Sequence, residues 1–336
     1  MNTTTGTTGT ATFATATSAA TATASGTASG THHPAGPHRL GRRNVRRIVA
    51  TTLLAAVSAG SVIGFGAPGA DAAATQNTTI LVVHGFDGGG LGDVPLDSAV
   101  DCTNSVMMDW VNGLRARGFT DVRTVGYYQG DRNCDVNLAP TARADNTINT
   151  SIDQIAREFA DMIAANFTAR NVNVAISAHS MGGMVVRRAL HGVQDHHAGF
   201  PARLLVSDVV TSGSPHAGAS VTALCGLLPG ALVPTQCSQL VPGSPFLQAL
   251  ANNPQATGGT DWTVIGSDCD SIVSGASAVS MTRVSLDRPS VFQRRFAAPS
   301  FFAGGCLLGA AGFDHTELVT AAAPLNVIRD GLLTNN

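Results

Sequence analysis

The segment from residue 174 to 189 reads VAISAHSMGGMVVRRA and contains a serine, Ser180, in a small-x-Ser-x-Gly pattern. A β-branched run precedes this serine and a helix-forming run follows it. A serine on a sharp strand-to-helix turn presents its hydroxyl at the end of a sheet, where it can act as a nucleophile. Such a turn needs small neighbours, and Ala178 and Gly182 provide them. The pattern predicts a nucleophile at Ser180.

An alternative is that Ser180 only caps the following helix, since a serine at that position can accept an amide hydrogen bond. Capping would explain the serine but neither the glycines at 182 and 183 nor the strand before them. The neighbouring His179 is expected to be a packing residue, because adjacent side chains on a sharp turn point apart.

A serine hydroxyl needs a base to take its proton. In hydrolases with a serine on such a strand-to-helix turn, the chain order is serine, acid, histidine, so the base should follow Ser180. Five histidines follow Ser180 in the sequence: His191, His196, His197, His216 and His315. The first three lie in or just after the helix that begins at the serine, too close to fold back. His315 stands in a loop before the last expected helix, which suits the base. His216, one strand too early, is the alternative.

The acid that orients the base should follow a strand between Ser180 and His315. The segment WTVIGSDCDSIV offers Asp268 and Asp270. Asp270 is preferred because the short segment SIV directly behind it can hold it in place. Asp314 is a third candidate but is expected to be a solvated loop residue.

An oxyanion formed during acyl transfer needs two backbone N–H donors, one after the nucleophile and one after an early strand. Met181 supplies the first by position, and Phe86 in the sequence HGF supplies the second. His84 is expected either to hold this loop by a hydrogen bond or to cap the strand. The glycine-rich run at 87–93 lacks the G-K-[ST] of a phosphate cradle, and is expected to form the rim of a pocket.

Short β-branched runs alternate with helical windows along the chain, which predicts an α/β fold with a mostly parallel sheet flanked by helices. The expected strands lie at 78–86, 122–128, 172–177, 203–215 and 262–267, and the expected helices at 105–118, 150–171 and 316–333, the last broken near Pro324. The apolar, Pro- and Gly-rich segment 216–260 interrupts this alternation. It is expected to cap a pocket, or alternatively to pack on the sheet edge.

Residues 1–74 differ in composition from the rest, 75–336, which is expected to form the folded domain. A Thr/Ala/Ser/Gly-rich start, an arginine cluster at 39–47 and an apolar stretch lead to small residues at 70–74. This order is typical of a secretory signal peptide, although a membrane anchor is an alternative. We therefore expect a secreted protein.

Composition narrows the function further. The net charge of −2 shows no excess of positive charge for binding nucleic acid. Hydrophobic residues make up 44% of the chain, which is enough for a sizeable core. An even number of cysteines behind an export signal favours disulfides, whereas the absence of C-x-x-C argues against a metal site. We predict sequential pairing: Cys102–Cys134, Cys225–Cys237 and Cys269–Cys306.

The motifs VVHGFDG, AHSMGG and GSPHAG, with an Asp in SDCDSIV and a His in FDHTELV, resemble the small secreted bacterial lipases of the α/β-hydrolase fold. The resemblance implies that Ser180 is the nucleophile, Asp270 the acid and His315 the base, with the amides of Phe86 and Met181 as oxyanion donors. The 216–260 insertion and the three predicted disulfides depart from the pattern.

These observations predict a secreted, monomeric serine hydrolase that cleaves carboxylic esters, above all acylglycerols at a lipid interface. It would need no cofactor and, after signal cleavage, would not stay inserted in a membrane. The alternatives are a short-chain carboxylesterase, a polyester depolymerase or an acyltransferase with the same triad. A more remote alternative is an inactive binding protein on this scaffold, but no triad or oxyanion position is missing.

Overall fold

The computed structural model describes residues 74–86, 99–138, 146–220, 233–281, 292–297, 306 and 312–334. All of them lie in one compact unit, Gly64–Asn336. The expected leader lies outside the described residues apart from Ala74, whose backbone N–H donates to the buried Asp208 carboxylate at 2.8 Å.

The described strands form one seven-stranded sheet in the order β3-β2-β1-β4-β5-β6-β7, with every neighbouring pair parallel. The strands are β1 (Thr79–Val83), β2 (Val122–Gly126), β3 (Val136–Asn137), β4 (Val174–His179), β5 (Val206–Ser212), β6 (Asp261–Ser267) and β7 (Phe292–Phe296). The central strands are buried along their whole length, as expected for a parallel sheet covered on both faces. The predicted fold class is confirmed.

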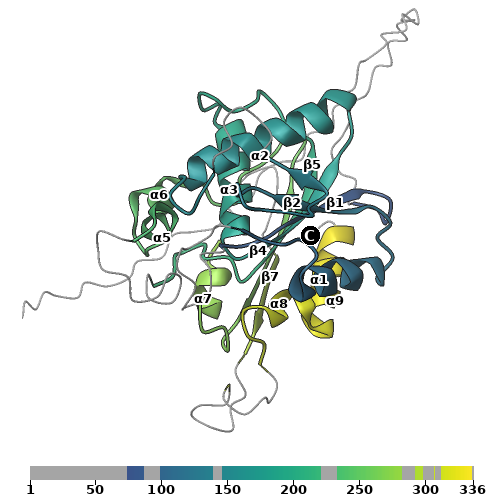
Figure 1. Cartoon of the computed structure of the whole chain (residues 1–336), viewed down its shortest axis with the longest axis vertical. Helices are drawn as coiled ribbons and strands as arrows, with labels where there is room; N and C mark the ends of the chain where they lie inside the picture. The colour runs from purple at the N-terminus through teal and green to yellow at the C-terminus, as the bar shows by residue number, and fades with distance from the viewer. Residues whose placement is uncertain are drawn as a thin grey trace, which may run out of the picture. The chain divides into compact units, whose positions relative to one another are not determined.

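Helices cover both faces of the sheet (Figure 1). One face carries α2 (Ile152–Asn166) and α3 (Met181–Gln194), and the other carries α1 (Ser105–Arg115), α8 (Glu317–Thr320) and α9 (Ala322–Leu333). The shorter helices are η1 (Thr168–Arg170), α5 (Thr235–Gln239), α6 (Pro245–Ala249) and α7 (Gly275–Ala278).

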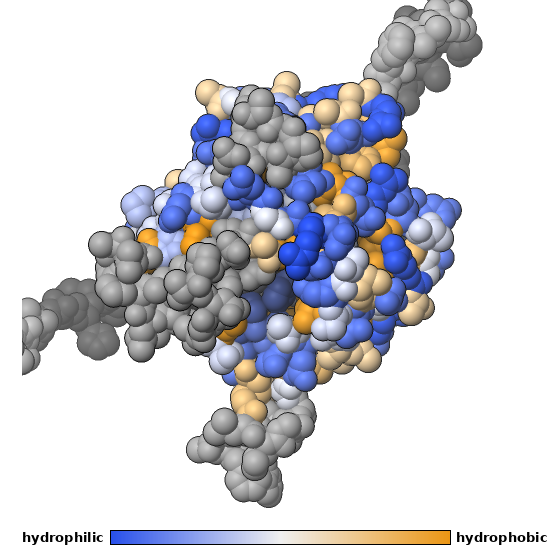
Figure 2. Space-filling model, viewed as in Figure 1, coloured by the Kyte–Doolittle hydropathy of each residue, from blue (hydrophilic) through white to orange (hydrophobic). Residues whose placement is uncertain are grey.

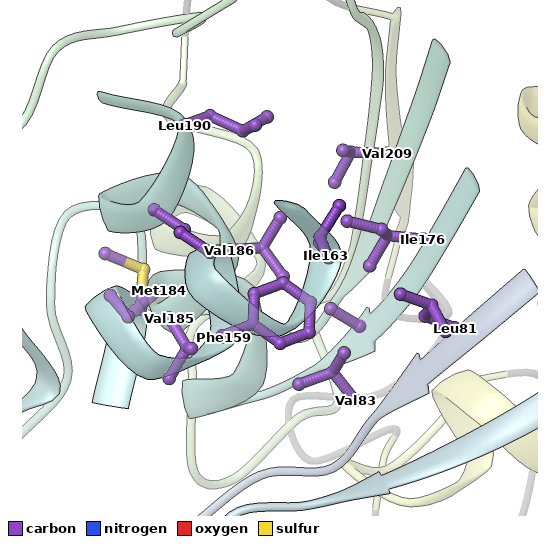
Figure 3. Close-up of a cluster of buried hydrophobic side chains, with 14 of the residues drawn as sticks. Leu81, Val83, Phe159, Ile163, Ile176, Met184, Val185, Val186, Leu190 and Val209 are labelled. Carbon is purple, nitrogen blue, oxygen red and sulfur yellow. The ribbon is translucent and has the colours of Figure 1, made fainter. Parts of the chain in front are cut away.

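The alternation of side chains along β1 joins these layers, because successive residues of a strand point to opposite faces. Leu81 and Val83 belong to the cluster built on α2 and α3, where Phe159 lies among them (Figure 3). Ile80 and Val82 belong to the second cluster, with α1 and α9. The strand is thereby buried on both sides and fixed in register.

The topology reverses direction at the centre of the sheet. The chain passes from β1 outward to β2 and β3, then returns to add β4 on the other side of β1. A parallel sheet opens a crevice at such a reversal, beyond the carboxyl ends of the two strands. Val83 and Ala178 are the last register pair there, so the HGF segment and Ser180 leave the sheet side by side.

The last helical region breaks at Ala321, between α8 and α9 and three residues before Pro324, so the predicted break near Pro324 is confirmed. Pro324 lies in the first turn of α9, where its missing N–H leaves no hydrogen bond unmade. The edge strand β7 was not predicted, because four of its five side chains are exposed and show no apolar alternation.

The described part of the 216–260 insertion is anchored beside α2. The side chain of Gln236 is buried and accepts a hydrogen bond from the Tyr128 hydroxyl at 2.6 Å. Gln239 accepts from the first backbone N–H of α2 at 2.9 Å. Residues 221–232 lie outside the described residues, so the capping role of this segment stays a prediction.

Two of the three predicted disulfides are confirmed. Cys102 is bonded to Cys134 and Cys269 to Cys306. The third predicted pair includes Cys225, which lies outside the described residues. The second disulfide fixes the residue directly before Asp270.

Replacing Cys102 and Cys134 together by alanine is expected to lower the free energy of unfolding by about 2–4 kcal/mol. The bond joins residues 32 apart in the sequence, so its loss gives the unfolded chain more conformations. Urea denaturation of the oxidised parent and the double variant measures the difference. An unchanged unfolding midpoint would contradict a stabilising role.

The surface of the described residues gives no sign of a bilayer-spanning element. Their helices are too short or too polar to cross a membrane. On the face shown in Figure 2, small apolar areas alternate with polar ones.

Candidate active site

Ser180 occupies the turn between β4 and α3 in a strained conformation. Its φ of 54° and ψ of −130° lie outside the regions that most residues adopt, and such strain is typical of functional sites. Its N–H donates to Ser212 O at 2.9 Å. The Ser180 side chain makes no capping hydrogen bond to α3, so the capping alternative does not explain this serine.

The glycines around Ser180 allow two backbone segments to approach it. A Cβ on Gly182 would lie 2.2 Å from the carbonyl oxygen of His84, and one on Gly85 would lie 2.6 Å from Ser180 Cβ and 3.2 Å from its Oγ. Backbone atoms cannot yield to such contacts as a flexible side chain can. The loop after β1 therefore lies directly against the candidate nucleophile.

The structure brings Asp270 and His315 together across 45 residues of sequence. His315 Nδ1 is 2.7 Å from Asp270 Oδ2, and the carboxylate is fully buried. Asp270 Oδ1 accepts hydrogen bonds from the N–H groups of Ile272 and Val273, each at 2.9 Å. The SIV segment therefore holds the carboxylate, as the sequence suggested.

The other two acid candidates have different partners. Asp268 forms an exposed ion pair with Arg295. Asp314 is exposed, and its Oδ1 accepts hydrogen bonds from the N–H groups at the start of α8, from Thr316 and Glu317. Of the three acid candidates, Asp270 is the one whose carboxylate makes a hydrogen bond to the His315 ring.

Gly213 places the Asp270–His315 pair next to the serine turn. Its φ is +59°, and a Cβ there would lie 3.1 Å from both Asp270 Oδ2 and His315 Cε1. The residue before it, Ser212, accepts the N–H of Ser180. The end of β5 thus contacts the acid–base pair on one side and the candidate nucleophile on the other.

His179 packs in this region, as expected, and also makes a hydrogen bond that the sequence did not suggest. Its Nε2 lies 2.8 Å from His315 O, and its ring packs edge-on against Trp110. Burial, together with the nearby His315, lowers the pKa of His179 to about 3. His179 is therefore neutral, and its Nε2–H donates the hydrogen bond to the carbonyl oxygen of His315. This bond positions the backbone of His315.

His216, the alternative base, has a different environment. Its Nε2 lies 2.9 Å from Thr211 Oγ1, and no carboxylate of the described residues bonds its ring. Two effects lower the pKa of His216 well below its usual range: chiefly its burial, and to a lesser extent the positive charge of Arg187. Without an acid to orient it, His216 lacks the arrangement that His315 has.

Arg187 connects the helix after Ser180 to the 216–260 insertion. Its buried guanidinium donates to the carbonyls of His216 and Ala251, both at 3.0 Å, and to the side chain of Asn252. Burial lowers the pKa of Arg187 to about 10. The insertion is thereby attached to the element that carries the candidate nucleophile.

The loop that carries Phe86 is held by His84 and by two residues that sequence reasoning did not identify, Tyr127 and Asp131. The Tyr127 hydroxyl donates to Gly85 O at 2.5 Å and to His84 O at 3.0 Å. His84 Nε2 lies 2.9 Å from the buried Asp131 carboxylate, and the rings of His84 and Tyr127 stack. His84 thus forms a hydrogen bond that holds this loop, which was one of the two expectations for it.

The two expected oxyanion donors each follow a residue of the serine turn region: Met181 comes directly after Ser180, and Phe86 comes directly after Gly85. Met181 is buried at the first position of α3. Phe86 is half-buried and packs on the core directly after Gly85. The expected rim at 87–93 lies outside the described residues.

Tyr127→Phe is expected to lower kcat for ester hydrolysis by about tenfold with little change in KM. Loss of the hydroxyl frees two carbonyls of the loop, so the Phe86 N–H would be held less firmly when charge develops on the oxyanion. Steady-state kinetics on a soluble ester measures both constants. Equal kcat values in the two proteins would contradict a positioning role for Tyr127.

Part of the chain matches a known protein family. Residues 139–290 match the family of class 2 lipases, a stretch that includes Ser180 and Asp270. The chain resembles the lipases of the α/β-hydrolase fold. No curated protein matches the sequence.

Several solved structures are similar to this chain. Lipase B of Aspergillus fumigatus is 16% identical, with a TM-score of 0.50 over 77% of this chain and 53% of that chain. A mature lipase of Bacillus licheniformis is 13% identical, with a TM-score of 0.46 over 79% of this chain and 95% of that chain. The phospholipase PlaB of Legionella pneumophila is 13% identical, with a TM-score of 0.45 over 77% and 61%. At these identities the likeness concerns the fold alone.

Proposed function

We propose that this protein is an exported serine hydrolase that cleaves carboxylic esters, above all acylglycerols, through an acyl-enzyme. The observation that carries the proposal is the buried Asp270–His315 hydrogen bond beside the strained turn of Ser180. An acid, a base and a serine assembled from three loops at one crevice match the arrangement that activates a serine hydroxyl.

In the first half of the reaction, Ser180 Oγ attacks the carbonyl carbon of the ester while His315 Nε2 takes the hydroxyl proton. Asp270 keeps the proton of His315 on Nδ1 and stabilises the imidazolium that forms. The N–H groups of Met181 and Phe86 bind the oxyanion. Transfer of the proton from His315 to the leaving oxygen then releases the alcohol and leaves an acyl group on Ser180.

In the second half, water replaces the alcohol. His315 takes a proton from the water, whose oxygen attacks the acyl carbon. The same two N–H groups bind the second oxyanion, and the proton returns to Ser180 Oγ as the carboxylic acid leaves. These steps need no cofactor, and we propose that the protein works as a monomer on ester substrate at an interface.

The choice of acylglycerols rests on two supports. The central region matches class 2 lipases, and the 216–260 insertion is rich in apolar residues that can bind an acyl chain. A short-chain esterase, a polyester depolymerase and an acyltransferase would use the same triad, and are outcomes of the test below.

The deciding experiment measures hydrolysis of a soluble short-chain ester and of an emulsified long-chain triacylglycerol, by the parent and by Ser180→Ala. Preference for the emulsion, with both activities lost in the variant, is the expected result. Activity on the short ester alone would replace lipase by esterase. Activity that survives in the variant, or no activity on either substrate, would contradict the proposed chemistry.

Export is proposed on the order of charges and small residues in the leader, and on two disulfides, which are typical of proteins made for oxidising compartments. Cleavage at 70–74 would leave a mature chain that begins close to Ala74, whose N–H already contacts Asp208. N-terminal sequencing of the protein from culture medium is expected to start in this region. A chain that stays with the membrane fraction and keeps its leader would favour the anchor alternative.

A further inference from the structure

A cluster of potential metal ligands lies at the carboxyl end of α3, away from the Ser180 turn. Three side chains each contribute one potential ligand atom, and these atoms all lie within 4.8 Å of one another: His191, Asp195 and His197. His191 Nε2 is 3.0 Å from Asp195 Oδ2, and the rings of His191 and His197 are 4.9 Å apart between centroids. Two imidazoles and a carboxylate therefore converge on one point.

The end of α3 folds so that this convergence is built into the backbone. His196 has a φ of +53°, in the left-handed region that commonly ends helices but usually with glycine. The N–H of His197 returns to Gly192 O at 2.8 Å, and that of His196 to Val193 O at 3.2 Å. This reversal brings the His197 ring back over the last turn of the helix, against His191.

We propose that His191, Asp195 and His197 bind a divalent transition metal of the zinc class. Two imidazole nitrogens, a carboxylate oxygen and a water make a common four-coordinate set for zinc. The carboxyl end of the α3 dipole adds a partial negative charge that favours a cation. His191 is buried, and its Nδ1 has no hydrogen-bond partner among the described residues.

Arg188 carries a positive charge next to this site, and the negative charge of Asp153 balances it. Its guanidinium pairs with the Asp153 carboxylate and stacks over the Phe200 ring. One of its nitrogens, Nη1, lies 3.1 Å from His197 Nδ1. A neutral imidazole has only one nitrogen with a free lone pair, so His197 can either accept the hydrogen bond from Arg188 or bind a metal. Metal binding would therefore replace the hydrogen bond between Arg188 and His197, while Arg188 would stay paired with Asp153.

The site is independent of the proposed hydrolysis. His191 follows Ser180 by eleven positions on one helix, a separation of about 16 Å at 1.5 Å per residue. A metal there would fix the end of α3 to the following turn. It should therefore raise the temperature of unfolding and leave kcat for a soluble ester unchanged.

The test is equilibrium dialysis of the full chain against Zn²⁺, with metal analysis and with the visible spectrum of the Co²⁺ form as a second readout. The parent is expected to bind one zinc that His191→Ala and His197→Ala do not bind at the same free concentration. Asp195→Asn, at a side chain that is 43% exposed, should fold normally and bind at least tenfold more weakly.

The matched control is His196→Asn, which removes the intervening histidine and keeps a residue that tolerates positive φ. It should bind zinc as the parent does. The proposal is overturned if the parent binds no zinc at micromolar concentrations. It is also overturned if Asp195→Asn and His197→Ala bind as much zinc as the parent, because the metal would then lie on other histidines.

Discussion

Ser180→Ala is expected to lower kcat for ester hydrolysis by a factor on the order of a million. The variant keeps the oxyanion donors and the Asp270–His315 pair, but it has no oxygen to form the acyl-enzyme. The hydroxyl makes no capping hydrogen bond to α3, so its removal should not lower the free energy of unfolding. Single-turnover assays with a chromogenic ester, which also detect a burst of released alcohol, measure the loss.

The matched control for this variant is Ser177→Ala on the same strand. Ser177 is buried, and its hydroxyl has no hydrogen-bond partner among the described residues. The control should therefore retain the parent's activity and fold. If Ser180→Ala kept more than a few per cent of the parent's rate, or if the control lost as much, the nucleophile would have to be another group.

The serine turn could be predicted from the sequence because its determinants are local. Small residues must surround the turn, and the close approach of Gly182 to the His84 carbonyl gives the physical reason. His315 and Asp270 could be selected by their order and by the strands before them, since a parallel sheet brings the carboxyl ends of its strands to one edge. The order of these residues along the chain was therefore enough to predict that they meet at one edge of the sheet.

The parts that could not be predicted depend on contacts between distant segments. Tyr127 and Asp131 carry no motif, and their role depends on β2 lying beside β1, which places them under the HGF loop. His179 was expected only to pack, because its hydrogen bond to the backbone of His315 spans 136 residues. Local patterns hold no information about such pairs.

The end of α3 is a related case. His191 and His197 were set aside as bases because they are near Ser180 in sequence, and that argument says nothing about a site at the other end of the helix. What brings them together is the left-handed residue His196, a position where the sequence gives no glycine to mark the reversal. The convergence became visible only with the backbone in place.

Asp270→Asn is expected to lower kcat by about ten-thousand-fold near neutral pH. The amide can turn its NH₂ group toward His315 Nδ1, which would leave that nitrogen as an acceptor and put the ring proton on Nε2. His315 could then no longer take the proton of Ser180. The two N–H donors of Ile272 and Val273 would still hold the side-chain oxygen, so the fold should survive. Steady-state kinetics and urea denaturation measure the two effects separately.

Asp268→Asn is the matched control, because it makes the same chemical change two residues away. It removes an exposed ion pair with Arg295, and such pairs contribute only about 0–1 kcal/mol to stability. Its kcat should stay within about twofold of the parent's. A large loss in Asp268→Asn together with a small one in Asp270→Asn would reverse the assignment of the acid. Since only Asp270 of these two bonds the His315 ring, that outcome would require the loop to rearrange when substrate binds.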